Sequence, residues 1–358
     1  MALIRKRRLT NQQTRRIEAQ QTRRVDEESD GELREGLIIT HYGRQLLVQE
    51  LGDNIDSPVV TESQGHSPQD IPLVDQQGSD QLSQKIWRCH ARTNLPVLVT
   101  GDRVRFQVDE NTELGVITAL HPRASLLTRP DRYHKVKPVA ANVTLIVVVF
   151  AALPVPSPLL IDRYLVACQQ ADIPALLVLG KADLLTPEDG LVDLLAEYNA
   201  LGYDTLTVQT DGDLSELIAK MADKTVVFVG QSGVGKSSLI NALIPDANLK
   251  VNIISENSAL GQHTTTTTTL LPLPNGGALI DSPGIREFGV WHLTVDAIRN
   301  GFIEMYPYYG MCRFRNCLHK NEPGCALIAA AAEGKVLPRR LASLNRLEDE
   351  AREAEKNA

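Results

Sequence analysis

The feature that most constrains this chain is a glycine-rich stretch, Gly230–Ser238, which reads Gly-Gln-Ser-Gly-Val-Gly-Lys-Ser-Ser. It fits the pattern G-x-x-x-x-G-K-[ST], in which backbone N–H groups surround the phosphates of a bound nucleotide. The β-branched run Lys224–Val229 before it predicts a strand, and the run Ser237–Leu243 after it predicts a helix. The motif requires a strand, a glycine-rich loop and a helix in this order. The chain is therefore expected to bind a nucleoside triphosphate.

Several side chains around this P-loop have the chemistry that phosphate groups and Mg²⁺ require. Lys236 is expected to contact the β and γ phosphates, and Ser237 to offer its hydroxyl to Mg²⁺. About fifty residues downstream, an apolar run ends in Asp281-Ser-Pro-Gly284. A carboxylate at the end of such a strand holds the Mg²⁺ shell, so Asp281 is a second magnesium candidate. The amide of Gly284 is expected to face the γ-phosphate.

A threonine run lies between these two motifs, in Gly261-Gln-His263 followed by Thr264–Thr269. P-loop GTPases place a threonine after the first helix, where it senses Mg²⁺ and the γ-phosphate. Thr265 and Thr266 are equal candidates for this role. The alternative for the later threonines is a β-prone strand with no role in binding.

The base is predicted from another apolar strand, Pro174–Leu179, which leads into Gly180-Lys181-Ala182-Asp183. This resembles the Asn-Lys-x-Asp motif, whose aspartate accepts hydrogen bonds from guanine N1 and N2. A base without those donors would leave the carboxylate unpaired, so guanine is favoured. Gly180 stands where asparagine is usual, which keeps an ATPase or a loosely selective NTPase open as an alternative. Thr205–Thr210 is expected to form the last nucleotide loop.

The order of the motifs is rearranged, because the guanine motif precedes the P-loop by about fifty residues instead of following it. This order predicts a circularly permuted GTPase domain. The termini of compact domains often lie close together, so a permuted chain can build the same site. The residues assigned to nucleotide binding are Gly180, Lys181, Ala182, Asp183, Gly230, Gln231, Ser232, Gly233, Val234, Gly235, Lys236, Ser237, Ser238, Asp281 and Gly284.

A second chemical signal is a cysteine cluster near the C-terminus. Four potential metal ligands fall within fourteen residues: Cys312, Cys317, His319 and Cys325. Thiolates with one imidazole suit tetrahedral Zn²⁺, and four protein ligands predict one structural ion. The alternative is a set of reduced core cysteines. Cys89 and Cys168 lie on apolar stretches and are expected to be small buried hydrophobes. We also identify no secretory signal or membrane span, so a reducing, cytoplasmic location is expected.

The N-terminal part of the chain is expected to contact RNA. Residues 1–24 carry eight basic side chains against Glu18 alone, although the net charge of the whole chain is −7. Residues 1–34 are therefore predicted to be a disordered, basic arm attracted to polyanions, with a solvated tail as the alternative. No apolar face accompanies the charge, so a membrane is not an expected partner.

Residues 35–125 read as a small RNA-binding β-barrel of the OB-fold type. The expected strands are Gly36–Thr40, Gln45–Gln49, Lys85–Ala91, Val104–Val108 and Leu114–Thr118. Tyr42, Trp87 and Phe106 are the aromatic residues available for stacking on bases, which favours docking without sequence specificity. The polar stretch from Gly52 to Gln84 is expected to be a loop.

The rest of the chain predicts two further domains. Residues 126–290 alternate strands with helices, which predicts an α/β domain with a parallel sheet covered on both faces. Residues 291–358 are expected to form a mostly helical domain around the zinc ligands. The fold class is thus multidomain: an N-terminal β-barrel, a central P-loop GTPase domain and a C-terminal zinc-binding domain.

The permuted motif order and the cysteine cluster resemble the RsgA (YjeQ) family of bacterial GTPases over about residues 35–350. The resemblance implies a monomer that binds the small ribosomal subunit and its rRNA, assists its late maturation and hydrolyses GTP to GDP with stimulation by the ribosome. It also implies that His263 positions the attacking water, since Ile285 stands where a glutamine would do so in Ras-like enzymes. A solvated loop histidine is the alternative. An RNA-binding protein with nucleotide as a structural ligand is the non-enzymatic alternative.

Overall fold

The fold is seen in a computed structural model that describes residues 32–42, 45–52, 85–109, 114–130, 135–245, 268–282, 285 and 294–357. The expected basic arm and the expected 52–84 loop fall almost wholly outside the described residues. His263, Thr265, Thr266 and Gly284 also lie outside them.

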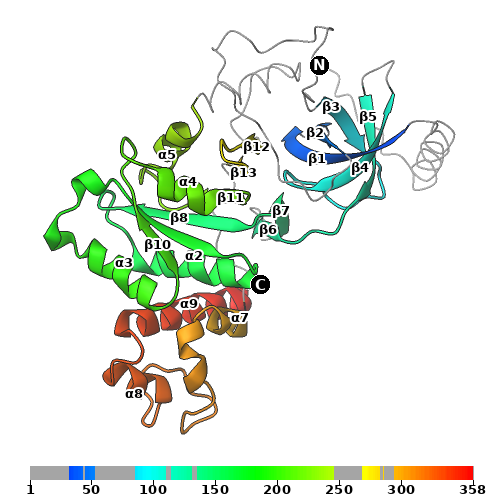
Figure 1. Cartoon of the computed structure of the whole chain (residues 1–358). Helices are drawn as coiled ribbons and strands as arrows, with labels where there is room; N and C mark the ends of the chain where they lie inside the picture. Colours follow the sequence, from blue (N-terminus) through cyan, green and yellow to red (C-terminus); the bar gives the residue numbers. More distant parts are fainter. Residues whose placement is uncertain are drawn as a thin grey trace, which may run out of the picture.

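The N-terminal part is a five-stranded barrel. Its strands are β1 (Leu33–Tyr42), β2 (Gln45–Leu51), β3 (Ile86–Ala91), β4 (Arg103–Asp109) and β5 (Leu114–Leu120). Strand β1 pairs with both β2 and β4, and β3 pairs with β5 in parallel. Antiparallel pairing of β4 with β5 closes the barrel (Figure 1). The barrel expected from five short strands is confirmed.

One expectation about the barrel is wrong. Trp87 and Phe106 are only 1% and 0% exposed, so they are not available to stack on bases. Side chains alternate between the two faces of a strand, and both residues fall on the inward face, next to Val104 and Ile117. Trp87 donates its indole N–H to Glu50 Oε2 at 2.8 Å at the rim of this core.

The central sheet carries the nucleotide motifs. Four parallel strands, β10 (Asp204–Thr207), β9 (Ala175–Gly180), β8 (Leu145–Ala151) and β11 (Thr225–Val229), are followed by β13 (Ala278–Asp281) and β12 (Thr269–Pro272). Strand β13 is parallel to β11, and β12 is antiparallel to β13. The helices of this domain are α2 (Pro158–Gln170), α3 (Leu191–Ala200), α4 (Ser215–Met221) and α5 (Lys236–Leu243). Two apolar clusters, one on each face of the sheet, form its core.

The barrel and the central sheet are hydrogen-bonded to each other. Strand β1 pairs with β12 at Thr40 and Thr269, so one continuous sheet runs from β10 to the barrel. Thr100 donates its hydroxyl to the carbonyl oxygen of Thr268 at 3.1 Å. A hairpin of β6 (Leu126–Pro130) and β7 (Val136–Ala141) lies at the same junction, and it was not predicted from the sequence.

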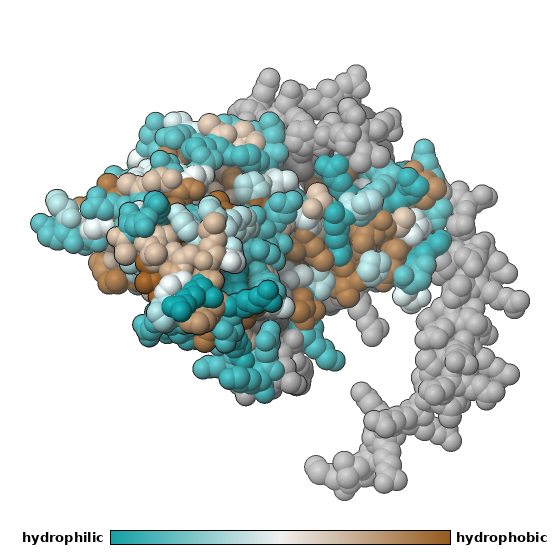
Figure 2. Space-filling model, turned by 90° about the horizontal axis from the view of Figure 1, so that it is seen from below, coloured by the Kyte–Doolittle hydropathy of each residue, from teal (hydrophilic) through white to brown (hydrophobic). Residues whose placement is uncertain are grey.

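The C-terminal part contains α7 (Val295–Asn300), the 3₁₀ helix η4 (Ile303–Tyr308), α8 (Ala326–Ala332) and α9 (Pro338–Asn357). Helices α7 and α9 pack on α2 of the nucleotide domain (Figure 1). A Cβ added at Gly301 would lie 2.8 Å from the Cα of Val166, so glycine permits this close approach. Figure 2 shows hydrophilic residues over most of the visible face, with smaller hydrophobic patches between them. No helix within the described ranges is long and apolar enough to cross a bilayer.

Candidate nucleotide and metal sites

The P-loop follows β11 at the carboxyl edge of the parallel sheet. Gly230 has a φ of 136°, and a Cβ there would lie 2.1 Å from the carbonyl oxygen of Val149 on the neighbouring strand β8. Glycine is therefore the residue that fits where the loop leaves the sheet. Gly235, with a φ of 101°, ends the loop, and α5 begins at Lys236.

The side chain of Lys236 folds back onto the P-loop. Its Nζ donates to the carbonyl oxygens of Gly230 at 2.8 Å and Gln231 at 2.6 Å. The side chain is 8% exposed, whereas Ser237 and Ser238 in the first turn of α5 are open to solvent. A buried ammonium and exposed hydroxyls at a helix N-terminus form an anion-binding arrangement.

The expected base loop lies directly against the P-loop. Lys181 donates from Nζ to the carbonyl oxygens of Gly233 at 2.8 Å and Leu153 at 2.7 Å. The N–H of Ala182 donates to the carbonyl oxygen of Val208 at 3.2 Å, which places the 205–210 segment beside the base loop. Asp183, in the 3₁₀ turn η1 (Ala182–Leu184), is exposed. Segments about fifty residues apart, in permuted order, thus meet in one place.

The magnesium candidate Asp281 lies at the same edge of the sheet. It ends β13, which runs parallel to β11, so the two strands deliver Asp281 and the P-loop to one side. The hydroxyl of Thr268 donates to that of Ser282 at 2.9 Å. This bond joins the end of the threonine run to the turn after Asp281.

Tyr164, which α2 places next to the P-loop, was not predicted from the sequence. Burial raises the pKa of Tyr164, and the N–H of Gly230 acts in the opposite direction by hydrogen bonding. The position of a tyrosine within an amphipathic helix does not distinguish this contact from ordinary core packing, because both follow the same period.

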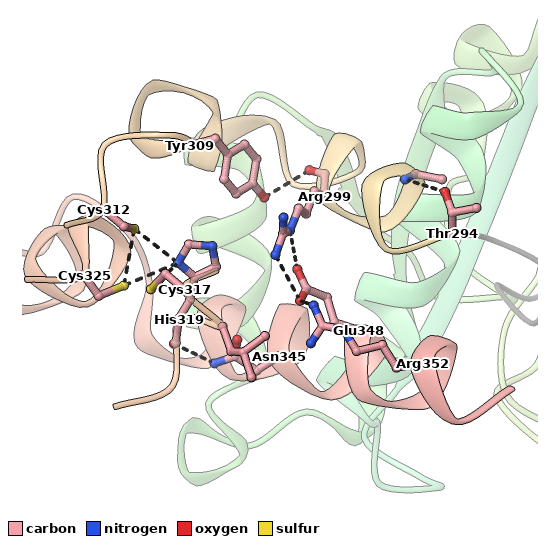
Figure 3. Close-up of polar contacts among 12 residues, drawn as sticks. Thr294, Arg299, Tyr309, Cys312, Cys317, His319, Cys325, Asn345, Glu348 and Arg352 are labelled. Atoms are coloured by element: carbon pink, nitrogen blue, oxygen red, sulfur yellow. Dashed lines mark hydrogen bonds and ion pairs between the residues drawn. The ribbon is translucent and has the colours of Figure 1, made fainter. Parts of the chain in front are cut away.

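The cysteine cluster converges on one point, although its four residues come from different turns (Figure 3). His319 Nδ1 lies 3.5 Å from the sulfur atoms of Cys312 and Cys317 and 3.4 Å from that of Cys325. The sulfur atoms of Cys312 and Cys325 are 3.9 Å apart. A tetrahedral ion with Zn–S of about 2.3 Å and Zn–N of about 2.0 Å separates its ligand atoms by roughly 3.5–3.8 Å. The donor set therefore fits a four-coordinate metal ion.

The loop that carries the cluster is organised by Glu322. Its carboxylate accepts the N–H groups of Leu318 and Lys320 at 2.9 Å and of Asn321 at 3.1 Å. These bonds, the one from Leu318 first, lower the pKa of Glu322 to about 2. Burial lowers the pKa of His319, which keeps the imidazole in the neutral form that binds metals.

Fold and site together define a P-loop nucleotide hydrolase whose guanine motif precedes its phosphate loop. The family model of the RsgA GTPase matches residues 120–291. A protein of Alcanivorax borkumensis named small ribosomal subunit biogenesis GTPase RsgA is 49% identical over 311 residues, which cover 85% of this chain and 86% of the relative. The chain belongs to the RsgA GTPase family.

Two solved structures share the whole architecture. YjeQ from Thermotoga maritima is 25% identical with a TM-score of 0.66, and the match covers 89% of this chain and 99% of YjeQ. YloQ, described as a circularly permuted GTPase, is 25% identical with a TM-score of 0.64, and the match covers 91% of this chain and 97% of YloQ. The expected family and fold class, including the permutation, are confirmed.

Proposed function

We propose that this chain hydrolyses GTP while bound to the small ribosomal subunit and thereby assists the late maturation of that subunit. The contact of the expected base loop with the P-loop, through Lys181 and Gly233, carries this proposal, because it brings the two candidate parts of a nucleotide site together. The relative from Alcanivorax borkumensis is named for biogenesis of this subunit, which supports the choice of partner.

The roles of the site residues follow from their chemistry. Lys236 neutralises the β and γ phosphates, and Asp183 accepts the guanine donors. Ser237, Asp281 and one of Thr265 and Thr266 supply the oxygen atoms that suit Mg²⁺. When bound, Mg²⁺ supplies charge neutralisation at the bridging oxygens.

The attacking water needs a polar partner. Ile285 is 3% exposed and apolar, so it cannot orient water. His263 takes this role in the proposal. The sequence has no obvious arginine finger, and such a group is worth roughly 10³–10⁵ in turnover, so slow intrinsic hydrolysis and stimulation by the ribosome are expected.

RNA is proposed to contact the basic arm (1–34), the barrel (35–125) and the zinc-binding domain (291–358), which flank the GTPase domain (126–290). A groove of about 540 Å³ beside the cysteine cluster is lined in part by Arg315 and Phe314, which are exposed. Arginine and aromatic side chains in one concavity suit phosphates and unpaired bases. One structural Zn²⁺, a monomeric state and a cytoplasmic location complete the proposal.

The test is a turnover assay with and without purified small subunits. We expect GTP hydrolysis to rise at least tenfold with the subunit in the wild type and to stay basal in His263→Ala, while both bind GTP equally. Lys236→Ala is expected to lose GTP binding. Equal hydrolysis of ATP and GTP would favour the loosely selective NTPase. Binding of GTP with no stimulated turnover would favour an RNA-binding protein with a structural nucleotide.

A further inference from the structure

The base loop is held to its surroundings by one side chain. Within the part of the chain that the structure describes, Lys181 supplies the side-chain hydrogen bonds between residues 180–183 and the neighbouring loops. Its backbone is left-handed, with a φ of 55°, and its side chain is about half-buried against the P-loop. This link and the backbone bond from Ala182 to the carbonyl oxygen of Val208 together hold the turn that carries Asp183, which would contact the base.

Gly180, which precedes Lys181, is buried at the end of β9 but does not need to be a glycine. Its φ is not among the positive values of the chain. A Cβ at this position would lie 3.6 Å from the carbonyl oxygen of Val234, 3.7 Å from Val149 Cγ1 and 3.8 Å from the carbonyl oxygen of Phe150. These are ordinary van der Waals contacts, so the backbone accepts a side chain here.

The nearest of these neighbours is a P-loop carbonyl. A short side chain with a donor at position 180 would be within reach of the Val234 carbonyl oxygen and would join the base loop to the P-loop a second time. A glycine makes no such bond. A binding loop with fewer restraints loses more conformational freedom when the ligand binds, which weakens affinity.

We infer that Gly180 sets the affinity of this site for guanine nucleotides below what the surrounding structure permits. The inference rests on the proposed function, because it assumes that Asp183 binds guanine. A hydrogen bond between the base loop and the P-loop would stabilise the bound complex. Its absence therefore raises the rate of GDP dissociation more than it changes the rate of association. Fast release of GDP is therefore a property of this chain.

The experiment compares Gly180→Asn and Gly180→Ser with the matched control Gly180→Ala in the full chain with Mg²⁺. The probe is a fluorescent GDP analogue chased with unlabelled GDP. One neutral hydrogen bond corresponds to about a three- to tenfold effect, so we expect Gly180→Asn and Gly180→Ser to dissociate that much more slowly. Gly180→Ala adds the Cβ without a donor, so it is the reference against which both donor variants are compared. Two donor variants cover the case in which the larger one does not fold.

The outcomes separate this inference from the function beneath it. Donor variants that release GDP as fast as Gly180→Ala overturn the inference and leave the GTPase intact. Equal slowing for an ATP analogue also overturns it, because the gain would then come from the P-loop and not from the base loop. A wild-type chain that binds no guanine nucleotide would overturn the proposed function itself.

Discussion

Asp183 is exposed, and Lys181 holds the turn that carries it against the P-loop. At the residue scale, a charged acceptor in this position selects a base by its donors. In the proposed site, the Asp183 carboxylate is the acceptor that a guanine would meet. Selectivity should therefore depend on one side chain.

Replacing Asp183 by Asn tests this dependence. Two charge-assisted hydrogen bonds are lost, so we expect affinity for GTP to fall about 100-fold or more, while affinity for XTP rises. Competition binding with GTP, XTP and ATP measures both changes. Asp189→Asn, in the exposed turn η2 (Pro187–Asp189), is the control and should keep the wild-type order. Unchanged preference for GTP in Asp183→Asn would contradict the assignment.

Short contiguous motifs made much of the site predictable. The P-loop, the base loop and the cysteine cluster each keep their chemistry within about fifteen residues, so spacing alone indicates the partners. Trp87 and Phe106 show the limit at this scale. The same aromatic residues suit a stacking surface and a barrel core, and the direction of a strand's inner face is set by tertiary packing.

At the scale of elements, the loop of the cysteine cluster combines two sets of restraints. The ligand atoms of Cys312, Cys317, His319 and Cys325 lie within 4.8 Å of one another, and Glu322 holds the turn between them. Asn345 of α9 also donates to the carbonyl oxygen of His319 at 3.1 Å (Figure 3). The loop is thus fixed from inside and from the neighbouring helix.

Removal of the metal should release this loop. Structural zinc in small peptides contributes on the order of 10–16 kcal/mol at pH 7, so chelation is expected to make residues 312–325 sensitive to proteases. Cys325→Ser should lose stoichiometric zinc by elemental analysis. Cys89→Ala, which changes a buried barrel residue, should keep one ion per chain. Equal zinc content in both variants would rule out the cluster.

Glu322 should strengthen metal binding without adding pH dependence near neutrality. Its pKa of about 2 lies below the ordinary value of 4.5, so its contribution is complete above about pH 4.5 and is lost as the pH falls toward 2. We expect Glu322→Gln to lower zinc affinity about three- to tenfold, by the same factor at pH 6 and pH 8. Competition with a chelating dye measures the zinc affinity of each variant. Glu355→Gln, on the exposed face of α9, is the control. A factor that changes between these pH values would contradict the assigned role.

At the scale of the whole molecule, a buried ion pair joins the nucleotide domain to the C-terminal helices. Asp162 of α2 accepts from Arg340 of α9 at 2.8 Å and from the hydroxyl of Tyr198 at 2.6 Å. Asp162 and Arg340 are both 0% exposed. Arg340 also donates to Glu304 of η4 at 2.7 Å. Burial opposes the charge of Arg340, but the two carboxylates outweigh it and raise the pKa of its guanidinium.

Breaking this pair should destabilise the protein strongly. We expect Asp162→Ala to lower the free energy of unfolding by about 1.5–3 kcal/mol, because Arg340 and Tyr198 lose their bonds to Asp162 while Glu304 still pairs with Arg340. Denaturant titration of the zinc-loaded chain measures this. Glu333→Gln removes an exposed ion pair with Lys335 and should change stability by less than about 1 kcal/mol. Similar effects of the two substitutions would show that the buried pair adds little.

The sequence did not predict the contacts that assemble the domains. Asp162 and Arg340 are 178 residues apart, and neither lies in a motif that indicates its partner. The sequence also does not predict the pairing of Thr40 with Thr269 or the β6–β7 hairpin. Hydrophobic periodicity identifies a strand but not the strand that pairs with it. Local patterns therefore predicted the fold class and the motifs, while the contacts between the parts of the chain required the structure.

The seam between β1 and β12 affects how this protein can be divided. If the chain were divided after the barrel, one fragment would expose the edge of β12 that pairs with β1. The other fragment would expose the edge of β1 that pairs with β12. Exposed strand edges pair with other chains, so the two fragments would associate with each other or self-associate. Experiments on separate parts of the chain should therefore keep the pairing of β1 with β12.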